Sequence, residues 1–147
     1  MAAYDLNSKD EPDTRSELEC FPEIDHGVEV AGDRVLVQLR REKTTSKGGI
    51  ILVDETKQTI KFNETVAKVI QLGPLAYKSP DDMMPWIEGP WCRPGDLVRT
   101  IKYGGDRFVV NANDDGAPVV FITLQAREII SRIKSFEYAQ KMKAFID

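Results

Sequence analysis

Arg34-Val-Leu-Val-Gln-Leu-Arg40 is the stretch that decides the fold class. Successive side chains of an extended strand point to opposite faces, so Val35, Val37 and Leu39 share one face. The polar residues of the stretch fall on the other face. This alternation predicts a strand that buries one side against a core and leaves the other side more polar.

Further short strands of the same kind follow along the chain. Turn signals separate them, including Pro94-Gly95-Asp96 and Asn113-Asp-Asp-Gly116, and no helical periodicity lies between them. The expected strands cover residues 65–72, 97–101, 107–111 and 119–122. Strands at this spacing predict an all-β fold, a small antiparallel β-barrel rather than a sheet of βαβ units.

The end of the chain allows two interpretations. Apolar residues from 125 to 146 recur at roughly helical spacing, which favours one long helix. Residues 129–133 fit a last strand equally well, with a short helix only from Ser135 onward.

Composition divides the chain into three parts. The net charge is −4, yet residues 1–26 carry eight acidic and two basic side chains, a net −6, which leaves +2 for the rest. We expect residues 1–27 to form a disordered acidic tail, 28–133 the barrel and 134–147 a helical extension. The start of the chain resembles neither a secretory signal nor a transit peptide.

Several classes of partner and site are not expected. No face is basic enough for nucleic acid, and no apolar run is long enough for a membrane. Cys20 and Cys92 form no disulfide framework or CxxC motif, which favours a cytoplasmic location. His26 is the one histidine and has no adjacent nucleophile, so neither a catalytic triad nor a zinc site is expected. The chain is therefore not expected to be an enzyme.

Residues 41–59 hold the least typical feature. A long hydrophilic run ends in Gly48-Gly49 and is followed by three adjacent aliphatic residues, Ile50-Ile51-Leu52. One interpretation is a buried strand after a wide turn. The other is a mobile loop that displays a small hydrophobic plug to a partner.

Five stretches, taken together and in order, resemble the GroES-type co-chaperonin family. They are Gly32-Asp-Arg-Val-Leu-Val37, Thr45-Ser-Lys-Gly-Gly-Ile-Ile-Leu52, Pro94-Gly-Asp-Leu-Val98, Lys102-Tyr-Gly-Gly105 and Glu128-Ile-Ile130. The last one resembles the opening of the family's closing strand, which favours a strand at residues 129–133.

The resemblance implies a GroES-like antiparallel β-barrel that assembles into a homo-heptameric lid. The lid would cap a GroEL-type chaperonin ring and enclose an unfolded client protein, with ATP bound by the chaperonin and no cofactor in the lid. Ile50, Ile51 and Leu52 would dock on the chaperonin's apical domains, and Gly48 and Gly49 would permit the turn before them. Residues 30–35 of one subunit and 129–133 of the next would pair as open strand edges.

Three features depart from the family pattern. They are the acidic start, the extension from 134 and a long excursion, residues 73–95, which contains five of the eight prolines. The excursion stands where the family has its roof hairpin, and either folds back on its own barrel or builds an altered dome. These departures suit a divergent or virus-encoded member.

Two other functions compete with the lid. A non-catalytic barrel adaptor in a larger assembly would need no chaperonin. A GroES-like domain of a dehydrogenase should bring zinc-binding cysteines and a GxGxxG stretch, and both are missing here.

Overall fold

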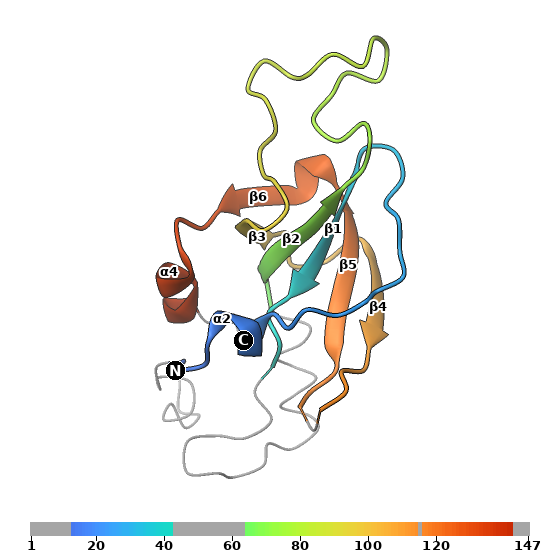
Figure 1. Cartoon of the computed structure of the whole chain (residues 1–147). Helices are drawn as coiled ribbons and strands as arrows, with labels where there is room; N and C mark the ends of the chain where they lie inside the picture. Colours follow the sequence, from blue (N-terminus) through green and yellow to red (C-terminus); the bar gives the residue numbers. More distant parts are fainter. Residues whose placement is uncertain (1–12, 43–63, 115, 143–147) are drawn as a thin grey trace.

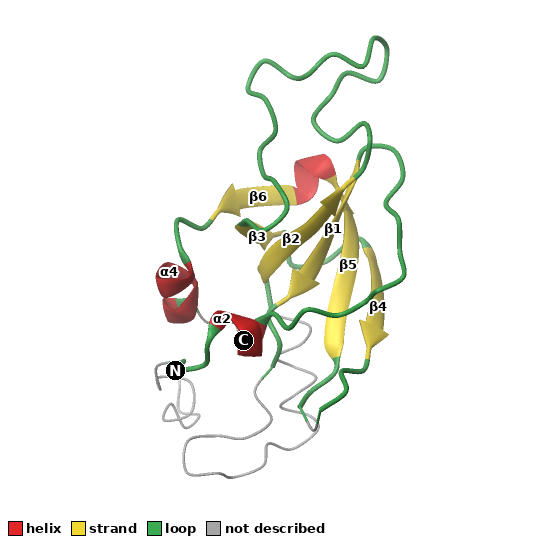
Figure 2. Ribbon diagram, in the orientation of Figure 1, coloured by secondary structure: helices red, strands yellow, loops and turns green. Residues whose placement is uncertain are grey.

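The computed structural model describes residues 13–42, 64–114 and 116–142. These residues form two short helices, one 3₁₀ turn and six strands (Figures 1 and 2). In chain order the elements are α2 Glu17–Cys20, β1 Arg34–Leu39, β2 Val66–Leu72, β3 Leu97–Thr100, β4 Asp106–Val110, β5 Val119–Gln125, η1 Ala126–Glu128, β6 Ile129–Arg132 and α4 Phe136–Lys141.

All six strands belong to one antiparallel sheet with the order β4-β5-β1-β2-β3-β6. The all-β fold and the short C-terminal helix are thereby confirmed, as is the strand interpretation of residues 129–133. Among the described residues, no helix is both long and apolar enough to cross a membrane.

The place of the first strand differs from the expectation. β1 is the centre of the sheet, because Val35 pairs with Leu72 of β2 on one side and with Leu124 of β5 on the other. Residues 34 and 35 therefore have their backbone partners within the subunit. The predicted pairing of residues 30–35 with a neighbouring subunit is wrong for these two positions.

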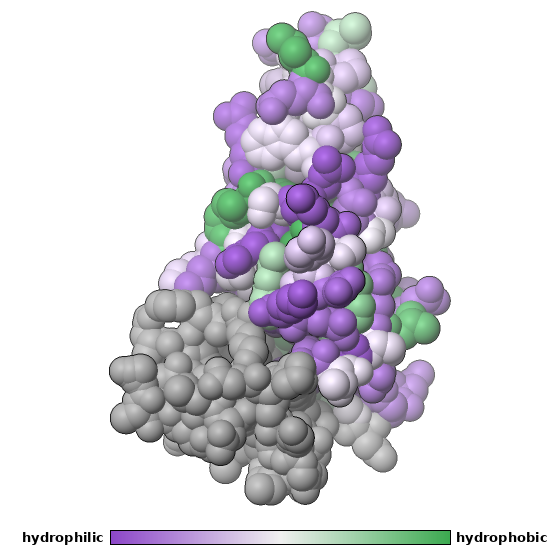
Figure 3. Space-filling model, turned by 90° about the vertical axis from the view of Figure 1, so that its left-hand side faces the viewer, coloured by the Kyte–Doolittle hydropathy of each residue, from purple (hydrophilic) through white to green (hydrophobic). Residues whose placement is uncertain are grey.

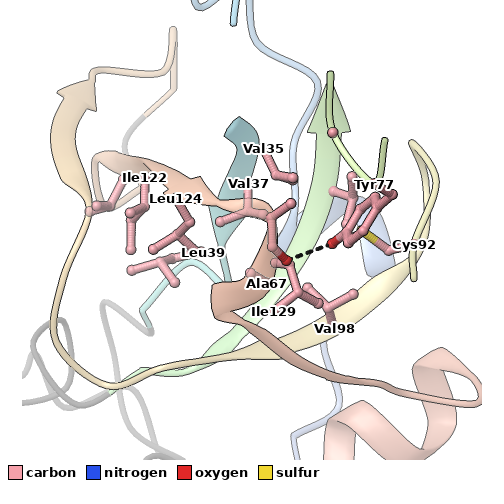
Figure 4. Close-up of a cluster of buried hydrophobic side chains, with 14 residues drawn as sticks. Val35, Val37, Leu39, Ala67, Tyr77, Cys92, Val98, Ile122, Leu124 and Ile129 are labelled. Carbon is pink, nitrogen blue, oxygen red and sulfur yellow. Dashed lines mark hydrogen bonds between the residues drawn. The ribbon is translucent and has the colours of Figure 1, made fainter. Parts of the chain in front are cut away.

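The main core lies on one face of this curved sheet. Val35, Val37 and Leu39 are buried there, as the alternating pattern predicts, together with Ile122 and Leu124 of β5 (Figure 4). Burial of such aliphatic side chains stabilises the fold by about 1.5–3 kcal/mol each before entropy is subtracted.

The other face of β1 is also covered, which the sequence pattern did not predict. The chain before β1 runs across the outside of β1 and β5 (Figure 1). Val30 from this segment packs with Leu36 and Phe121, and the Gln38 amide donates a hydrogen bond to the Pro22 carbonyl at 2.9 Å. A strand read as half exposed is thus buried on both faces.

The expectation of a disordered tail over residues 1–27 does not hold for its described part, residues 13–27. Helix α2 begins with a capping box, in which Ser16 accepts from the Glu19 amide and Glu19 accepts from the Ser16 amide. Cys20 and Phe21 follow and are fully buried. Two apolar side chains in the core, together with a cap, offset the cost of ordering this acidic segment.

The base of the excursion folds back on the sheet. Tyr77 and Cys92 belong to the main core, and Trp86 and Trp91 pack against it. Tyr77 adopts a φ of 60°, which aromatic residues rarely do. The conformation persists because the ring is buried and its hydroxyl donates a 2.9 Å hydrogen bond to the Ala126 carbonyl (Figure 4).

The tip of the excursion projects away from the sheet (Figure 1). Met83, Met84 and Ile87 are its exposed apolar side chains. The space-filling view shows hydrophobic surface at the far end of this projection (Figure 3). The excursion therefore contacts the main core at its base and exposes apolar side chains at its tip.

Candidate functional site

The predicted binding residues lie outside the described part of the chain. Gly48, Gly49, Ile50, Ile51 and Leu52 all fall within residues 43–63. The structure does describe where this segment leaves and rejoins the sheet. We call residues 40–42 and 64–66 the two stems.

The stems are held side by side by the sheet. Leu39 at the end of β1 pairs with Ala67 near the start of β2. One step further, the Arg40 amide donates to the Val66 carbonyl at 2.9 Å. The chain that carries the predicted docking residues therefore departs from and returns to one end of the β1–β2 ladder.

A buried ion pair joins the stems. Arg40 Nε lies 2.6 Å from Oε1 of Glu64, and the two side chains are only 6% and 4% exposed. Oε2 of Glu64 also accepts from the backbone amides of Thr65 and Val66. These bonds satisfy the carboxylate, which would be costly to bury unpaired.

Arg41 connects the first stem to the turn between β4 and β5. Its guanidinium bonds both carboxylate oxygens of Asp114 and donates through Nε to the Ala117 carbonyl at 2.5 Å. The two bonds from Arg41, with a third from the Gly116 amide, lower the pKa of Asp114 to about 2. Gly116 lies so close that a Cβ there would collide with the guanidinium. Arg41, predicted to begin a mobile loop, is instead buried.

The first stem also contacts the segment before β1. Arg41 donates its amide to the Cys20 carbonyl at 2.8 Å, and its own carbonyl accepts from Arg15 Nη1 at 2.6 Å. Asp13 orients the Arg15 guanidinium through two hydrogen bonds.

Burial raises the pKa of the Cys20 thiol to about 11, so this thiol stays protonated and unreactive at neutral pH.

The C-terminal helix α4 also contacts the first stem and the segment before β1. Arg40 Nη1 donates to the Ala139 carbonyl at 2.8 Å. The Gln140 side-chain amide donates to the Arg15 carbonyl at 2.7 Å and so ties α4 to the N-terminal segment. The stems therefore lie between the two ends of the described chain.

Apolar packing accompanies these polar contacts. Ala139 of α4 is fully buried in a cluster with Cys20 and Phe21 of the N-terminal segment. Val66 of the second stem and Leu97 of β3 belong to the same cluster. The second stem and the two terminal segments thus share one small core.

The charged stem residues were not found by sequence reasoning, although two signals were present. Arg40-Arg41 comes directly after a buried strand, where a charged pair must find partners. Ser16-Glu-Leu-Glu19 has the capping-box pattern that marks a helix start within the acidic tail. The partners Glu64 and Asp114 are distant in sequence and carry no such signal.

A metal site is the other kind of site to consider in the described residues. Within residues 13–42, 64–114 and 116–142, no group of three or more histidine, cysteine or acidic side chains could hold a metal ion. His26 accepts a hydrogen bond from the Val28 amide and packs on Phe121, 5.5 Å between ring centroids. It serves the packing of the segment before β1.

Comparison with known proteins identifies the family of the chain. Residues 28–131 match the sequence model of the family described as "Chaperonin 10 Kd subunit". A protein named "Co-chaperonin GroES" from Chlamydia pneumoniae is 29% identical over 103 residues, which cover 70% of this chain and 87% of the relative. Its namesake from Corynebacterium jeikeium is 32% identical over 69% of this chain and 89% of its own length. The one from Lactobacillus acidophilus is 35% identical over 50% of this chain and 70% of its own length.

Proposed function

Because the chain belongs to the chaperonin 10 kDa subunit family and is a co-chaperonin rather than an enzyme, we propose that it works as an oligomeric lid on a chaperonin ring. The lid caps a GroEL-type, ATP-driven ring in the cytoplasm and encloses a non-native client. ATP binds to the chaperonin, and the lid needs no cofactor. A viral source for the chain stays a prediction.

The docking residues of this proposal are Ile50, Ile51 and Leu52, with Gly48 and Gly49 before them. The observation that supports them is the arrangement of the stems, which a buried Arg40–Glu64 pair holds together at one end of the sheet. A segment that departs from and returns to one rigid point can present an apolar triplet without disturbing the barrel. The run before the triplet, residues 41–47, is hydrophilic, which favours its exposure to solvent.

Weak single contacts suit such a lid. Burying three aliphatic side chains contributes very roughly 5–9 kcal/mol gross, and ordering the segment around them costs about 1 kcal/mol or more per residue. One docking segment alone therefore binds weakly. Several segments on one ring bind together through their effective concentration and still release in each cycle.

Assembly into a ring, with seven subunits by resemblance, is part of the proposal. β6 is an outer strand of the described sheet, bonded to β3 on one side, and its Ile130 is 61% exposed. An outer strand exposes backbone groups that favour pairing with another chain. We propose that β6 meets residues 30–33 of a neighbouring copy, the part of the predicted pairing segment that precedes β1. Repetition of this head-to-tail contact closes a ring.

The test combines two measurements on one preparation. Native mass spectrometry at micromolar concentration should show a ring, and added ring should inhibit the ATPase of a GroEL-type chaperonin at saturating ATP. A monomer alone would contradict the assembly. A ring without any effect on the ATPase would favour the runner-up function, a barrel adaptor that never meets a chaperonin.

A further inference from the structure

The two terminal segments, residues 13–21 and 136–142, lie outside the residues that match the family, 28–131. They nevertheless supply several hydrogen-bond partners of the first stem. Cys20 and Ala139 offer carbonyl oxygens to Arg41 and Arg40, and Arg15 donates to the Arg41 carbonyl. The lid proposed above has no need of these contacts for its sheet, since β1 already pairs on both sides.

We propose that the two terminal segments form a clasp around the stems, and that Arg15 and Gln140 are positioning residues for chaperonin binding. This inference rests on the proposed function. The clasp closes because Gln140 of α4 donates to the Arg15 carbonyl, while Arg15 reaches over to the first stem. Arg15 contacts the first stem and Gln140 contacts Arg15, so each would act on chaperonin binding through the stems.

The physical effect concerns conformational entropy. A binding segment whose ends are already fixed loses less freedom when its centre docks, and its affinity is correspondingly higher. The clasp fixes the first stem at the Arg41 amide and carbonyl and at the Arg40 guanidinium. Every subunit of a ring has the same advantage. A small increase in the affinity of each docking segment therefore becomes a large increase in the affinity of the whole lid.

The alternative is that the terminal segments only add core. Cys20, Phe21 and Ala139 do bury apolar surface, and that contribution to stability is independent of any partner. The two roles are separable because the Arg15 and Gln140 side chains contribute polar links and do not belong to the buried cluster. Removing those links should spare the cluster.

The experiment uses the full chain with Arg15→Ala and Gln140→Ala combined. Glu17→Gln is the matched control, because Glu17 lies on the same N-terminal segment but bonds Lys68 of β2 instead of a stem. Hydrogen exchange of the Arg41 amide reports on the clasp. The chaperonin ATPase reports on function, through the ring concentration that gives half-maximal inhibition and through the inhibition reached at saturation.

We expect the double variant to keep its ring mass and to reach full inhibition at saturation, although its melting temperature should fall modestly because the Arg41 carbonyl loses a donor. Its Arg41 amide should exchange faster, and its half-maximal concentration should rise about tenfold as a small effect per segment is multiplied around the ring. Arg15→Lys, which keeps a donor within reach of the Arg41 carbonyl, should recover part of the affinity. The Glu17→Gln ring should behave as the unmodified protein.

Three outcomes would overturn the clasp. The first is an Arg41 amide that exchanges no faster in the double variant than in the unmodified protein. The second is faster exchange with an unchanged ring concentration for half-maximal inhibition. The third is a Glu17→Gln ring that inhibits the ATPase as weakly as the double variant. If the double variant lost its ring, Gln140→Ala alone would decide by the same criteria. If the unmodified ring did not inhibit the ATPase, the proposed function would be contradicted instead. The exchange rate of the Arg41 amide would still show whether the terminal segments stabilise the stems.

Discussion

Arg40 Nε and Glu64 Oε1 lie 2.6 Å apart where the chain leaves β1 and where it returns to β2. Both side chains are buried, and Arg40 also bonds the Ala139 carbonyl of the C-terminal helix. This pair therefore connects the sheet, the stems of the proposed docking segment and the end of the chain. Removal of this ion pair should therefore perturb the sheet, the stems and α4.

Glu64→Ala should lower the free energy of unfolding by about 3–5 kcal/mol, because it leaves the Arg40 guanidinium buried without its counter-charge. Urea unfolding followed by circular dichroism measures the change. Glu17→Ala is the control, since the Glu17–Lys68 pair is far more exposed than Arg40–Glu64 and should contribute only about 1 kcal/mol or less. Equal losses in the two variants would show that burial of the Arg40–Glu64 pair is unimportant.

Ile51→Asp should abolish inhibition of the chaperonin ATPase and leave ring mass and melting temperature nearly unchanged. A carboxylate forced into an apolar groove costs several kcal/mol in each docking segment, and the ring repeats that cost. Ile51→Val should retain most of the inhibition. If Ile50-Ile51-Leu52 were a core strand instead, Ile51→Asp would unfold the protein, because polar substitutions in a core are among the most damaging.

Acid should weaken the contact between Arg41 and the turn that carries Asp114. The pKa of Asp114 is lowered from 3.8 to about 2 in the folded chain, so its contribution is complete above about pH 4 and is lost as the pH falls toward 2. Urea midpoints at pH 5, 4, 3 and 2 should converge for the unmodified protein and Asp114→Asn. A gap between them that persists at pH 2 would argue against this assignment.

Tyr77→Phe should loosen the base of the excursion. The substitution removes the hydroxyl that donates to the Ala126 carbonyl and leaves that acceptor unpaired, which costs about 1–3 kcal/mol. Tryptophan fluorescence should detect the change directly, because Trp86 and Trp91 pack against the Tyr77 ring with centroids 5.3 Å and 5.5 Å away. Tyr103→Phe, at an exposed position, should alter neither stability nor fluorescence.

Local patterns were sufficient for most of the strands. Alternation and turn residues predicted strands at 65–72, 97–101, 107–111 and 119–122, and the structure has strands at Val66–Leu72, Leu97–Thr100, Asp106–Val110 and Val119–Gln125. The last of these extends to Gln125 because its residues 121–125 pair with β1. Such strands are encoded by neighbours in sequence, which is why a pattern can find them.

The sequence by itself determined the all-β class, the helix after Ser135 and the family of the chain, because these depend on residue order and local periodicity. Only the tertiary structure decided that β1 is central, that residues 13–21 are ordered and that Arg40 and Arg41 are buried. Each of these depends on partners far along the chain. Arg40 reaches Glu64 and Ala139, 24 and 99 residues away, and Arg41 reaches Ala117, 76 residues away. A buried charge is stable only when it is paired or hydrogen-bonded, and here the partners are brought close only by the folding of the whole chain.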